Sequence, residues 1–526
     1  MKSKAISILN DVLGPVMRGP SSSHTAGSFH IGALARALLG DELASATFVF
    51  DPGGSLAEVY RQQGSDLGFA AGMMGWSITD ERFSQALRLA AEQGLSITFA
   101  VEPLPDADHP NTVEIRMASR GGRRLCAVAK SIGGGAVVFT RVAGWPVHLT
   151  GDAHEVLVVL DEVDGAEQAV RKLLAQDGQV MGQVSRLVQG GEVLLYARRQ
   201  AALDVGIGTE VEALPGVSAV WSATPIFFVR RGKPLFSSAA EMVALAEERD
   251  CSLGQVALAY ESALLGISED EVLDEIARRF EVMRRAVHRG LGEDLPPMQL
   301  LRPSARQVYQ AEAEGRTAIG GIHTRAAARS MAVMHVNGGA GVVCAAPTAG
   351  SAGVIPGVVV TLAEEGRGNF PRLDRERAAL ALLAASAVGL VTATRATFAA
   401  EVAGCQVEIT ASGAMAAAAV IEAAGGSARQ ATGAAAIVFQ NTMGLICDLV
   451  QGIVEIPCHT RNAVAASGAF VCADLILGGY VNPIPLDETI DAVYAVGQML
   501  PRELKCTALG GLALTPSALA MGRVGE

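Results

Sequence analysis

Three cysteines in the last quarter of the chain have the residue type and the surroundings of a metal site. Cys405 lies in the segment GCQVE, Cys447 in GLICD and Cys458 in IPCHTRN. Glycine and proline residues beside the last two thiols indicate loops or element ends, and loops can aim distant thiolates at one point. Because thiolates are soft ligands, the pattern is typical of an iron–sulfur cluster or of zinc.

The spacing of these thiols, 42 and 11 residues, leaves other interpretations open. A free cysteine is commonly a small buried hydrophobic residue, and each of the three could be no more than that. A zinc site would need a fourth ligand, for which His459 and Cys506 are available.

A polar run near the N-terminus supplies groups that could bind a substrate. The segment GPSSSHT contains five hydrogen-bonding side chains in succession, namely Ser21, Ser22, Ser23, His24 and Thr25. The same run could instead cap the helix that follows it.

Further polar positions combine small side chains with glycine. In SIGGG, Ser131 precedes Gly133 and Gly134, and such a turn can point backbone N–H groups at a carboxylate. Thr348 and Ser351, in PTAGS, likewise combine small polar side chains with a nearby glycine. The alternative for these segments is a simple turn.

The composition limits the classes of protein that these residues could serve. The chain has 526 residues, half of them hydrophobic, which predicts several domains with ample cores. A net charge of −12, with both signs spread along the sequence, argues against a nucleic-acid partner. Eight cysteines are too few for a disulfide framework. We therefore expect a cytoplasmic protein.

Two apolar stretches are candidates for membrane or export segments, and neither fits well. The N-terminal stretch is short and interrupted by Asn10 and Asp11, so it is a poor signal peptide. The charge-free stretch 378–394 is slightly short for a bilayer span of about 20 residues. We interpret it as a buried core helix and expect no membrane partner.

Hydrophobic periodicity divides the chain into three regions. Residues 1–152 mix strands, such as 46–52 and 113–119, with a helix over 79–94, and predict an α+β domain. A middle domain follows over 153–226. After a linker, residues 237–526 predict a mostly α-helical catalytic domain that carries the three cysteines.

The middle domain has the element order βαββαβ. Strands are predicted at 155–162, 180–188, 192–198 and 217–223, and helices at 165–176 and 206–213. Gly190 and Gly191, between the second and third strands, are a hairpin signal. The order is that of a ferredoxin-like unit and resembles a small ligand-binding ACT domain.

The helical domain has clear start and stop signals. Ser237 and Ser238 offer an N-cap for its first helix. Residues 268–290 are amphipathic, with an acidic start, a basic end and Gly290 as a stop. Frequent alanine and glycine predict helices that pack closely.

The segments around these motifs resemble those of bacterial iron–sulfur L-serine dehydratases over nearly the whole chain. GPSSSHTAGSFHIGALAR (19–36), GGSLAEVY (53–60), SIGGG (131–135) and NGGAGVVCAAPTAGSAGVIP (337–356) look like successive segments of that family. GCQVE, GLICD and IPCHTRN look like its three cluster motifs, and LKCTALGGLALTPSA (505–519) resembles its terminal segment. In many relatives a beta-type and an alpha-type half are separate chains, and here the two look fused.

The resemblance implies a 4Fe–4S cluster held by Cys405, Cys447 and Cys458. Three thiolates leave one iron free to act as a Lewis acid on the 3-hydroxyl of L-serine. A base removes the Cα proton, and the aminoacrylate product tautomerises and hydrolyses to pyruvate and ammonia. No pyridoxal phosphate is required, and such a lyase serves amino-acid catabolism and gluconeogenesis.

The resemblance also implies roles for the polar motifs. Asn337 is one candidate for substrate contact, with an ordinary turn asparagine as its alternative. The full set of implied substrate contacts is Ser21, Ser22, Ser23, Thr25, Ser55, Ser131, Gly133, Gly134, Asn337, Thr348 and Ser351. A homodimer is expected by analogy, because ACT-like sheets often pair.

One departure from the family concerns proton transfer. The family usually has Gly-His-Gly-Thr-Asp after the GSLA-type motif, whereas this chain has Gln63 where that histidine is expected. Glutamine cannot titrate. His24, His459 or the carboxylate of Asp66 would have to serve as the acid–base group, or the substrate differs.

Three alternatives therefore stay open. The same cluster chemistry could act on another 3-hydroxy or 3-substituted amino acid. A pyridoxal-phosphate lyase with SIGGG as its phosphate loop would need a lysine, and Lys130 is adjacent. The ACT-like region could instead make the chain a non-catalytic amino-acid sensor.

Overall fold

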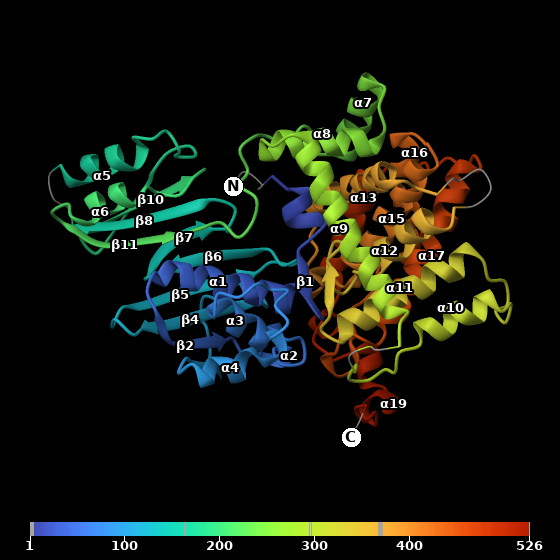
Figure 1. Ribbon diagram of the computed structural model, residues 1–526, viewed down its shortest axis with the longest axis horizontal. Helices are drawn as coiled ribbons and strands as arrows, with labels where there is room; N and C mark the ends of the chain where they lie inside the picture. The colour runs from blue at the N-terminus through green and yellow to red at the C-terminus, as the bar shows by residue number, and fades with distance from the viewer. Residues whose placement is uncertain (1–4, 162–164, 294, 296, 367–371, 525–526) are drawn as a thin grey trace.

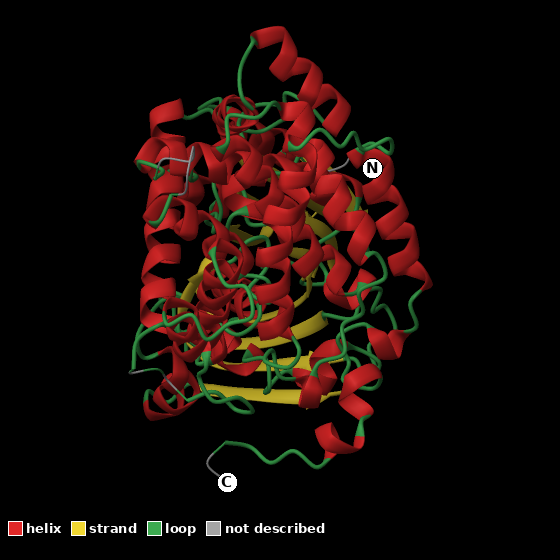
Figure 2. Ribbon diagram, turned by 90° about the vertical axis from the view of Figure 1, so that its right-hand side faces the viewer, coloured by secondary structure: helices red, strands yellow, loops and turns green. Residues whose placement is uncertain are grey.

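The two larger sheets lie on one side of the molecule, and most of the helices of the C-terminal half lie on the other (Figure 1). The computed structural model describes residues 5–161, 165–293, 295, 297–366 and 372–524. Seen from the helical side, the strands lie behind the helices (Figure 2). The chain is a multidomain protein of mixed α and β structure.

A six-stranded sheet with order β3-β2-β4-β5-β6-β7 forms the first α/β unit. Only β2 and β3 pair in parallel, and the other neighbours are antiparallel. The ring centroids of Phe48 and Phe69 are 4.1 Å apart, so aromatic stacking joins the sheet to its covering helices. The elements are β2 (Leu43–Phe50), β3 (Ser96–Val101), β4 (Thr112–Ser119), β5 (Arg124–Ser131), β6 (Val137–Val142), β7 (Trp145–Leu149), α1 (Gly27–Leu39), α2 (Ser55–Val59), α3 (Ser65–Met73) and α4 (Ala86–Glu92).

The helix expected over 79–94 is shorter than predicted. Helical structure begins at Phe83, as a 3₁₀ turn (Phe83–Gln85) followed by α4, whereas the preceding residues form a turn. The Asp80 carboxylate accepts hydrogen bonds from the backbone N–H and the guanidinium of Arg82, at 2.9 and 3.0 Å. A side chain that bonds the backbone two residues ahead competes with helix formation.

A four-stranded antiparallel sheet with order β11-β8-β10-β9 forms the second unit. Its elements follow the order βαββαβ: β8 (His154–Asp161), α5 (Ala166–Ala175), β9 (Ser185–Gln189), β10 (Glu192–Arg199), α6 (Val205–Glu212) and β11 (Val217–Ala223). The hairpin predicted at Gly190 and Gly191 connects β9 to β10. The strand expected from residue 180 begins only at Ser185, and Val180 makes one isolated bridge to Arg199.

The rest of the chain is helical. Its helices are α7 (Ala239–Arg249), α8 (Leu253–Leu265), α9 (Glu269–Gly290), α10 (Ala305–Ala313), α11 (Ile322–Gly338), α12 (Val354–Glu364), α13 (Arg375–Arg395), α14 (Ala400–Ala403), α15 (Ile409–Ala423), α16 (Ala428–Thr442), α17 (Cys458–Leu477), α18 (Leu486–Met499) and α19 (Pro516–Leu519). Ser238 caps the first of them by accepting a hydrogen bond from the N–H of Glu241. In the described part of the chain, α13 alone is long and apolar enough to cross a membrane, and 78% of that window is buried inside the protein.

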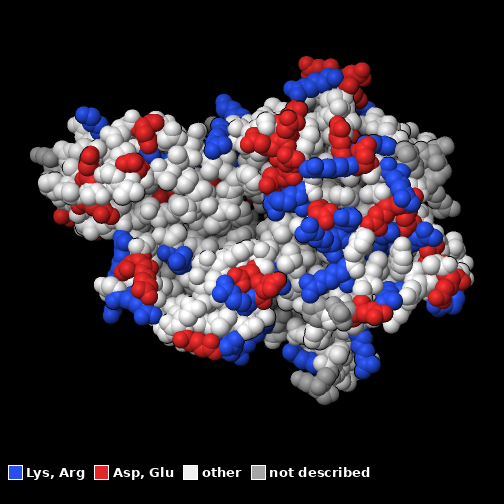
Figure 3. Space-filling model, viewed as in Figure 1, with Lys and Arg blue, Asp and Glu red and all other residues white. Residues whose placement is uncertain are grey.

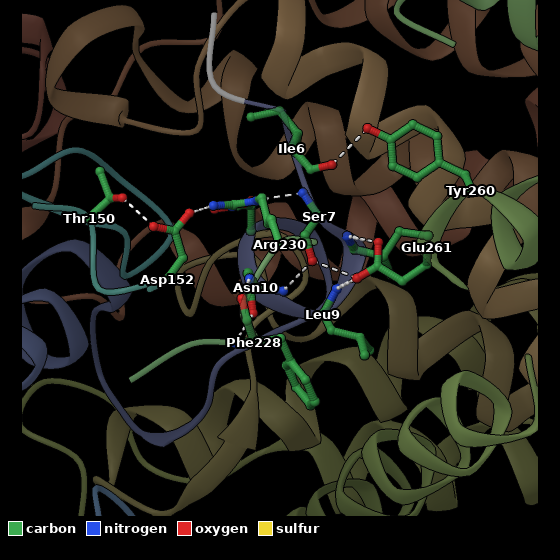
Figure 4. Close-up of polar contacts among 12 residues, drawn as sticks. Ile6, Ser7, Leu9, Asn10, Thr150, Asp152, Phe228, Arg230, Tyr260 and Glu261 are labelled. Carbon is green, nitrogen blue, oxygen red and sulfur yellow. Dashed lines mark hydrogen bonds and ion pairs between the residues drawn. The ribbon is translucent and has the colours of Figure 1, made fainter. Parts of the chain in front are cut away.

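The first described residues pack with the helices and not with the first sheet. Ile8 and Leu13 are fully buried in the helical core, and β1 (Val16–Arg18) pairs antiparallel with β12 (Val342–Cys344). The Glu261 carboxylate accepts hydrogen bonds from the Ser7 hydroxyl at 2.5 Å and from the N–H of Leu9 at 3.0 Å (Figure 4). The N-terminal segment thus ties the expected domain 1–152 to the C-terminal half.

Charged side chains of both signs are intermixed on the surface. On the face shown in Figure 3, Lys and Arg alternate with Asp and Glu over the helical half, without a continuous basic area on that face. Many of these groups are ion pairs within one helix, such as Arg284 with Glu281 at 2.9 Å.

Candidate active site

Three cysteine side chains from separate segments meet in one buried cluster. Cys405 begins a 3₁₀ turn, Cys447 lies in the loop between α16 and α17, and Cys458 is the first residue of α17. Each is at most 3% exposed. The Sγ atoms of Cys405 and Cys447 and a carboxylate oxygen of Glu408 all lie within 4.8 Å of one another.

A glycine allows two of these loops to approach. Gly404 has φ +77°, and a Cβ atom at this position would lie 2.8 Å from the carbonyl oxygen of Leu445. The N–H of Gln406 donates to that same oxygen at 3.1 Å, and the Gln406 side chain accepts from the N–H of Gly444 at 2.9 Å. Residue 404 must therefore lack a side chain for the loops of Cys405 and Cys447 to meet.

A small cavity lies between the two halves of the chain at these thiols. Cys447, Cys458 and Cys506 line it from the helical half. Its other walls are formed by Ser21, Ser23, Gln63, Gly350, Ala400, Glu401, Glu408, Leu449 and Val454. The enclosed space is about 20 Å³, enough for about one water molecule.

The donor chemistry of the cavity fits an iron–sulfur group. Thiols from separate loops can converge on one inorganic centre, and soft sulfur donors suit iron–sulfur clusters. The enclosed space is smaller than a cluster, so the cysteine side chains would have to move apart to hold one. Of the two candidates for a fourth zinc ligand, His459 does not line the cavity, whereas Cys506 does.

Electrostatics favour one thiolate in this group. The hydrogen bond with Cys447 and the nearby Arg461 guanidinium lower the pKa of Cys405, against the effect of burial. The interactions with Cys405 and Cys506, together with burial, hold the pKa of Cys447 well above its usual range. The Arg461 guanidinium also pairs with Asp448 at 3.0 Å and donates to the carbonyl of Ile446, so it is fixed beside the thiols.

Two carboxyl groups, the buried Glu401 and the partly exposed Glu408, line the cavity, and the sequence motifs did not single them out. Burial raises the pKa of Glu401, and burial with the charge of Cys405 raises that of Glu408 well above its usual range. The Asn111 amide donates to Glu401, and Thr348 hydrogen-bonds Glu408. Glu408 is the last residue of GCQVE. Its closeness to Cys405 in sequence was the one feature that could have pointed to it as a site residue.

The serine run reaches the cavity through two of its members. Ser21 and Ser23 line the cavity wall, while Ser22 is buried beside them. The Ser21 side chain also caps the following π-helical turn by accepting from the N–H of His24 at 3.2 Å. The Thr25 hydroxyl donates to the backbone carbonyl of Gln63 at 2.7 Å and so helps to fix the segment that carries this glutamine. Ser21 therefore caps the turn and also lines the cavity.

The three predicted acid–base residues lie outside the described cavity wall. The His24 ring contacts Ser23 at 3.0 Å and Ser55 at 3.1 Å, and burial lowers its pKa to about 3. Asp66 lies in the first turn of α3 and accepts from the N–H of Leu67 at 2.9 Å, and burial raises its pKa. Neither is among the residues that line the cavity.

His459 is engaged by a second histidine. The N–H groups of Ser304 and Ala305 donate to Nε2 of His335, at 3.0 and 3.1 Å, so the proton of His335 is on Nδ1. That N–H donates to Nδ1 of His459 at 3.1 Å. Burial and the neighbouring His335 lower the pKa of His459 to about 3. Nε2 of His459 lies near Gly338 on α11, 3.5 Å from the position of a Cβ there, and has no hydrogen-bond partner among the described residues.

The remaining residues that were predicted to contact the substrate lie around the cavity and support the segments that form its wall. Gly133 and Gly134 have φ of +96° and +61°, and a Cβ on Gly133 would lie 2.8 Å from the backbone N of Ala399. The Asn337 amide donates to the carbonyl of Pro20 at 2.8 Å, which holds the start of the serine run. These residues position the segments on which the lining groups lie.

The hydroxyl groups predicted from the other motifs also bond protein atoms. Thr348 and Ser351 bond each other at 3.0 Å. Ser55 donates to the carbonyl of Cys506 at 3.3 Å. Ser131 is buried against Gly27 at the start of α1, and its hydroxyl has no hydrogen-bond partner among the described residues.

Fold and cavity together define a small-molecule enzyme in which a helical half supplies thiols and an α/β half supplies hydroxyl groups. Comparison with known proteins gives a family: the family model described as "Serine dehydratase alpha chain" matches residues 237–513. The chain belongs to the serine dehydratase family.

Curated relatives match both halves of such enzymes. The "Probable L-serine dehydratase, alpha chain" of Bacillus subtilis is 35% identical over 283 residues, which are 54% of this chain and 93% of the relative. The "Probable L-serine dehydratase, beta chain" of the same organism is 35% identical over 212 residues, 40% of this chain and 94% of the relative. The "L-serine dehydratase, alpha chain" of Peptoniphilus asaccharolyticus is 33% identical over 53% of this chain and 94% of its own length. The present chain therefore joins alpha-type and beta-type halves.

Proposed function

We propose that this chain is an iron–sulfur-dependent L-serine ammonia-lyase that converts L-serine into pyruvate and ammonia. The observation that carries the proposal is the convergence of Cys405, Cys447 and Cys458 in one buried cluster, beside a cavity that serine hydroxyls and carboxyl groups line. Relatives named L-serine dehydratase, 33 to 35% identical and matching more than nine tenths of their own length, support the same reaction.

The three cysteines would hold a 4Fe–4S cluster. When bound, the cluster supplies a Lewis acid that favours departure of the substrate hydroxyl. Ser21 and Ser23 offer hydroxyl groups for the substrate carboxylate or amine, and the neighbouring apolar wall excludes water.

The Cα proton needs a base, and Glu401 is the candidate that the cavity offers. Its carboxyl group lines the cavity, is held by the Asn111 amide and has a raised pKa because of burial. A raised pKa brings a carboxylate closer to the range of an effective general base. His24, Asp66 and His459, the acid–base candidates from the sequence, remain proposed as alternatives to Glu401.

The finer organisation is part of the proposal. We propose a beta-type domain over 1–152, an ACT-like domain over 153–226 and the catalytic alpha-type domain over 237–526. The strand order β11-β8-β10-β9 supports a ferredoxin-like fold for the middle domain. A cytoplasmic location and a homodimer belong to the same proposal.

A pyridoxal-phosphate mechanism has less support. The ammonium group of Lys130, beside SIGGG, forms an ion pair with Asp108 at 2.7 Å. A Schiff-base lysine needs a free amine at the reacting carbon, and an ion pair stabilises the charged form instead.

Anaerobic reconstitution with iron and sulfide, followed by a screen of amino acids for keto-acid release, tests the function. We expect L-serine to give pyruvate and ammonia in equal amounts. Because Gln63 replaces a family histidine, the screen should include other 3-hydroxy and 3-substituted amino acids. A loaded protein that binds amino acids but releases no keto acid would contradict a lyase and favour a sensor.

A further inference from the structure

Asn111 is a buried asparagine of the N-terminal half that the sequence motifs did not single out. It lies directly before β4, and none of its surface is exposed. Its N–H donates to Nδ1 of His109 at 3.1 Å, and its carbonyl accepts from the N–H of Ser131 at 3.3 Å. These two bonds fix the backbone of Asn111 and hold its side chain in one place at the start of β4.

The side chain of Asn111 crosses from the N-terminal half to the helical half. Its amide donates to the carboxyl group of Glu401, which lies 290 residues away in the first turn of α14. Glu401 is 5% exposed and lines the cavity, whereas Asn111 does not line it. Asn111 therefore acts on the cavity through Glu401, the proposed base.

The SIGGG loop brings the two segments close enough for this contact. Gly133 has φ +96°, and a Cβ at this position would lie 2.8 Å from the backbone N of Ala399, two residues before Glu401. Ser131, the first residue of the same loop, is the one that bonds the Asn111 carbonyl. The loop that fixes Asn111 thus also packs against the segment that carries Glu401.

The amide of Asn111 suits a carboxyl group that must change its protonation state. Its Nδ2 group donates to a carboxylate, and its Oδ1 atom can accept from a protonated carboxyl group. Oδ1 of Asn111 is buried and has no hydrogen-bond partner among the described residues. A protonated Glu401 can therefore form a second bond to Asn111, in addition to the one that the structure shows.

We propose that Asn111 is a positioning residue for the lyase reaction, which holds the Glu401 carboxyl group ready to receive the Cα proton. The inference rests on the proposed function and deepens it. In this step the proton passes from Cα to an oxygen of Glu401, and the electron pair of the C–H bond forms the Cα–Cβ double bond. The 3-hydroxyl leaves with the electrons of its bond to Cβ, and the protonated Glu401 then donates to Oδ1 of Asn111.

Asn111→Leu in the full-length, anaerobically reconstituted protein tests the inference. Leucine keeps the approximate volume of the side chain but donates no hydrogen bond. We expect kcat with L-serine to fall by about 10- to 100-fold, the usual effect of losing a hydrogen bond to a charged group. KM should change little, because residue 111 does not line the cavity. The acid limb of the kcat profile should move to higher pH, because the carboxylate of Glu401 loses a donor that favours it.

Infrared spectroscopy of the same proteins measures the contact without turnover. The C=O band of protonated Glu401 is the band that is missing from Glu401→Gln, and its pH midpoint should rise in Asn111→Leu. Burial raises the pKa of Glu401, and the hydrogen bonds of Ser23 and Asn111 lower it. The subtraction is needed because other titratable groups lie nearby in the described part of the chain, namely His109, Cys405, Glu408, Cys447, Cys458 and Cys506.

Asn10→Ala is the matched control. Asn10 is 4% exposed, and its side chain bonds the backbone of Phe228 through both its amide and its carbonyl group, each at 2.9 Å. Its loss should reduce stability but leave kcat and the infrared midpoint unchanged.

An unchanged infrared midpoint in Asn111→Leu, or an unchanged kcat, would overturn the inference. Wild-type protein that releases no pyruvate from L-serine would contradict the proposed function, whatever the midpoints are. If Asn111→Leu does not fold, Asn111→Asp takes its place, since this variant keeps the shape of the side chain and lacks the donor. A second carboxylate beside Glu401 should shift the midpoint in the same direction.

Discussion

At the scale of single residues, burial shifts the pKa values of the titratable side chains that line the cavity or lie near it. The imidazoles of His24 and His459 have pKa values of about 3, chiefly because burial disfavours the charged ring. Both stay neutral throughout the neutral and mildly acidic range. The carboxyl groups of Glu401 and Glu408 are shifted in the opposite direction, toward neutral pH, also by burial. The pH dependence of turnover should therefore come from carboxyl groups.

Glu401→Gln tests the role of the proposed base. The amide keeps the size of the side chain and can still bond Asn111, but it cannot accept the Cα proton. We expect kcat to fall by about 10²- to 10⁴-fold, the usual contribution of a general base. Iron content, measured on the same preparation, should stay at the wild-type level.

Glu422→Gln is a matched control for that variant. Glu422 is a largely buried carboxyl group with a raised pKa, but it accepts from the N–H of Gly254 and does not line the cavity. Its replacement should leave kcat unchanged. Equal rates for Glu401→Gln and wild type would assign proton removal to another group.

The sequence identified the cysteines and serines of the site but not its carboxyl groups. Cys405, Cys447 and Cys458 were recognisable from residue type and motif, and the fold brings them together. Glu401 and Glu408 could not be selected, because sequence does not show which glutamates are buried. The contact of His459 with His335 could not be predicted for a similar reason, because His335 lies on another helix, 124 residues away.

At the scale of elements, close packing in the helical half depends on residues without side chains. Gly290, at the end of α9, lies against α11, and a Cβ there would be 2.0 Å from the carbonyl oxygen of Ala332. Gly357 on α12 makes a similar approach to the carbonyl of Ala326, at 2.7 Å. The alanine and glycine content predicted such packing, but not the positions of the contacts.

Gly290→Ala and Gly468→Ala form a pair that measures this packing. The first variant should lose about 1–3 kcal/mol of unfolding free energy, because its methyl group meets backbone atoms that cannot yield. Gly468 on α17 has no atom within 4 Å of a Cβ, so alanine should be neutral or stabilise by up to about 1 kcal/mol. Chemical denaturation of both variants provides the comparison. Similar stabilities would show that the helices can move apart at Gly290.

Elements with strong local signals were predicted better than their boundaries. The strands β2, β4, β8, β10 and β11, and the helices α5, α7 and α9, are close to their expected positions. The helix predicted over 79–94 was too long, because a turn at Asp80 replaces its first residues. The packing of residues 5–18 on the helical half could not be predicted, since β1 pairs with β12, which is over 300 residues away.

At the scale of the whole molecule, a chain of polar contacts connects the sheets to the helical core. The Arg230 guanidinium lies between Asp152, after the first sheet, and Asp11 in the N-terminal segment, to which it donates at 2.6 Å. The N–H of Ser7 donates to Asp11 at 2.8 Å, and the Ser7 hydroxyl bonds Glu261 on α8 (Figure 4). These contacts fix the two halves whose surfaces meet at the cavity.

Glu155, on β8, makes the free energy of unfolding depend on pH. Burial raises its pKa to about 7, although Arg198 and the Tyr196 hydroxyl favour the carboxylate. Between about pH 4.5 and 7 the folded protein holds a proton that the unfolded chain releases, so stability falls as pH rises through this window. Above pH 7 the loss reaches up to about 3 kcal/mol.

The Glu155→Gln variant lacks this titration. Relative to wild type, its unfolding free energy should therefore increase between pH 5 and pH 8, and denaturant titrations at both values measure the change. A difference between the two proteins that stays constant with pH would show that Glu155 is ionised in the folded state.

The most direct test of the central claim is the iron and acid-labile sulfide content of anaerobically reconstituted protein. Wild type should bind about four irons and four sulfides per chain. Cys405→Ala, Cys447→Ala and Cys458→Ala should each lose the full complement, while a Cys472→Ala control keeps it. Full iron content in any of the three variants, or a wild-type protein that binds zinc in place of iron and sulfide, would contradict the account.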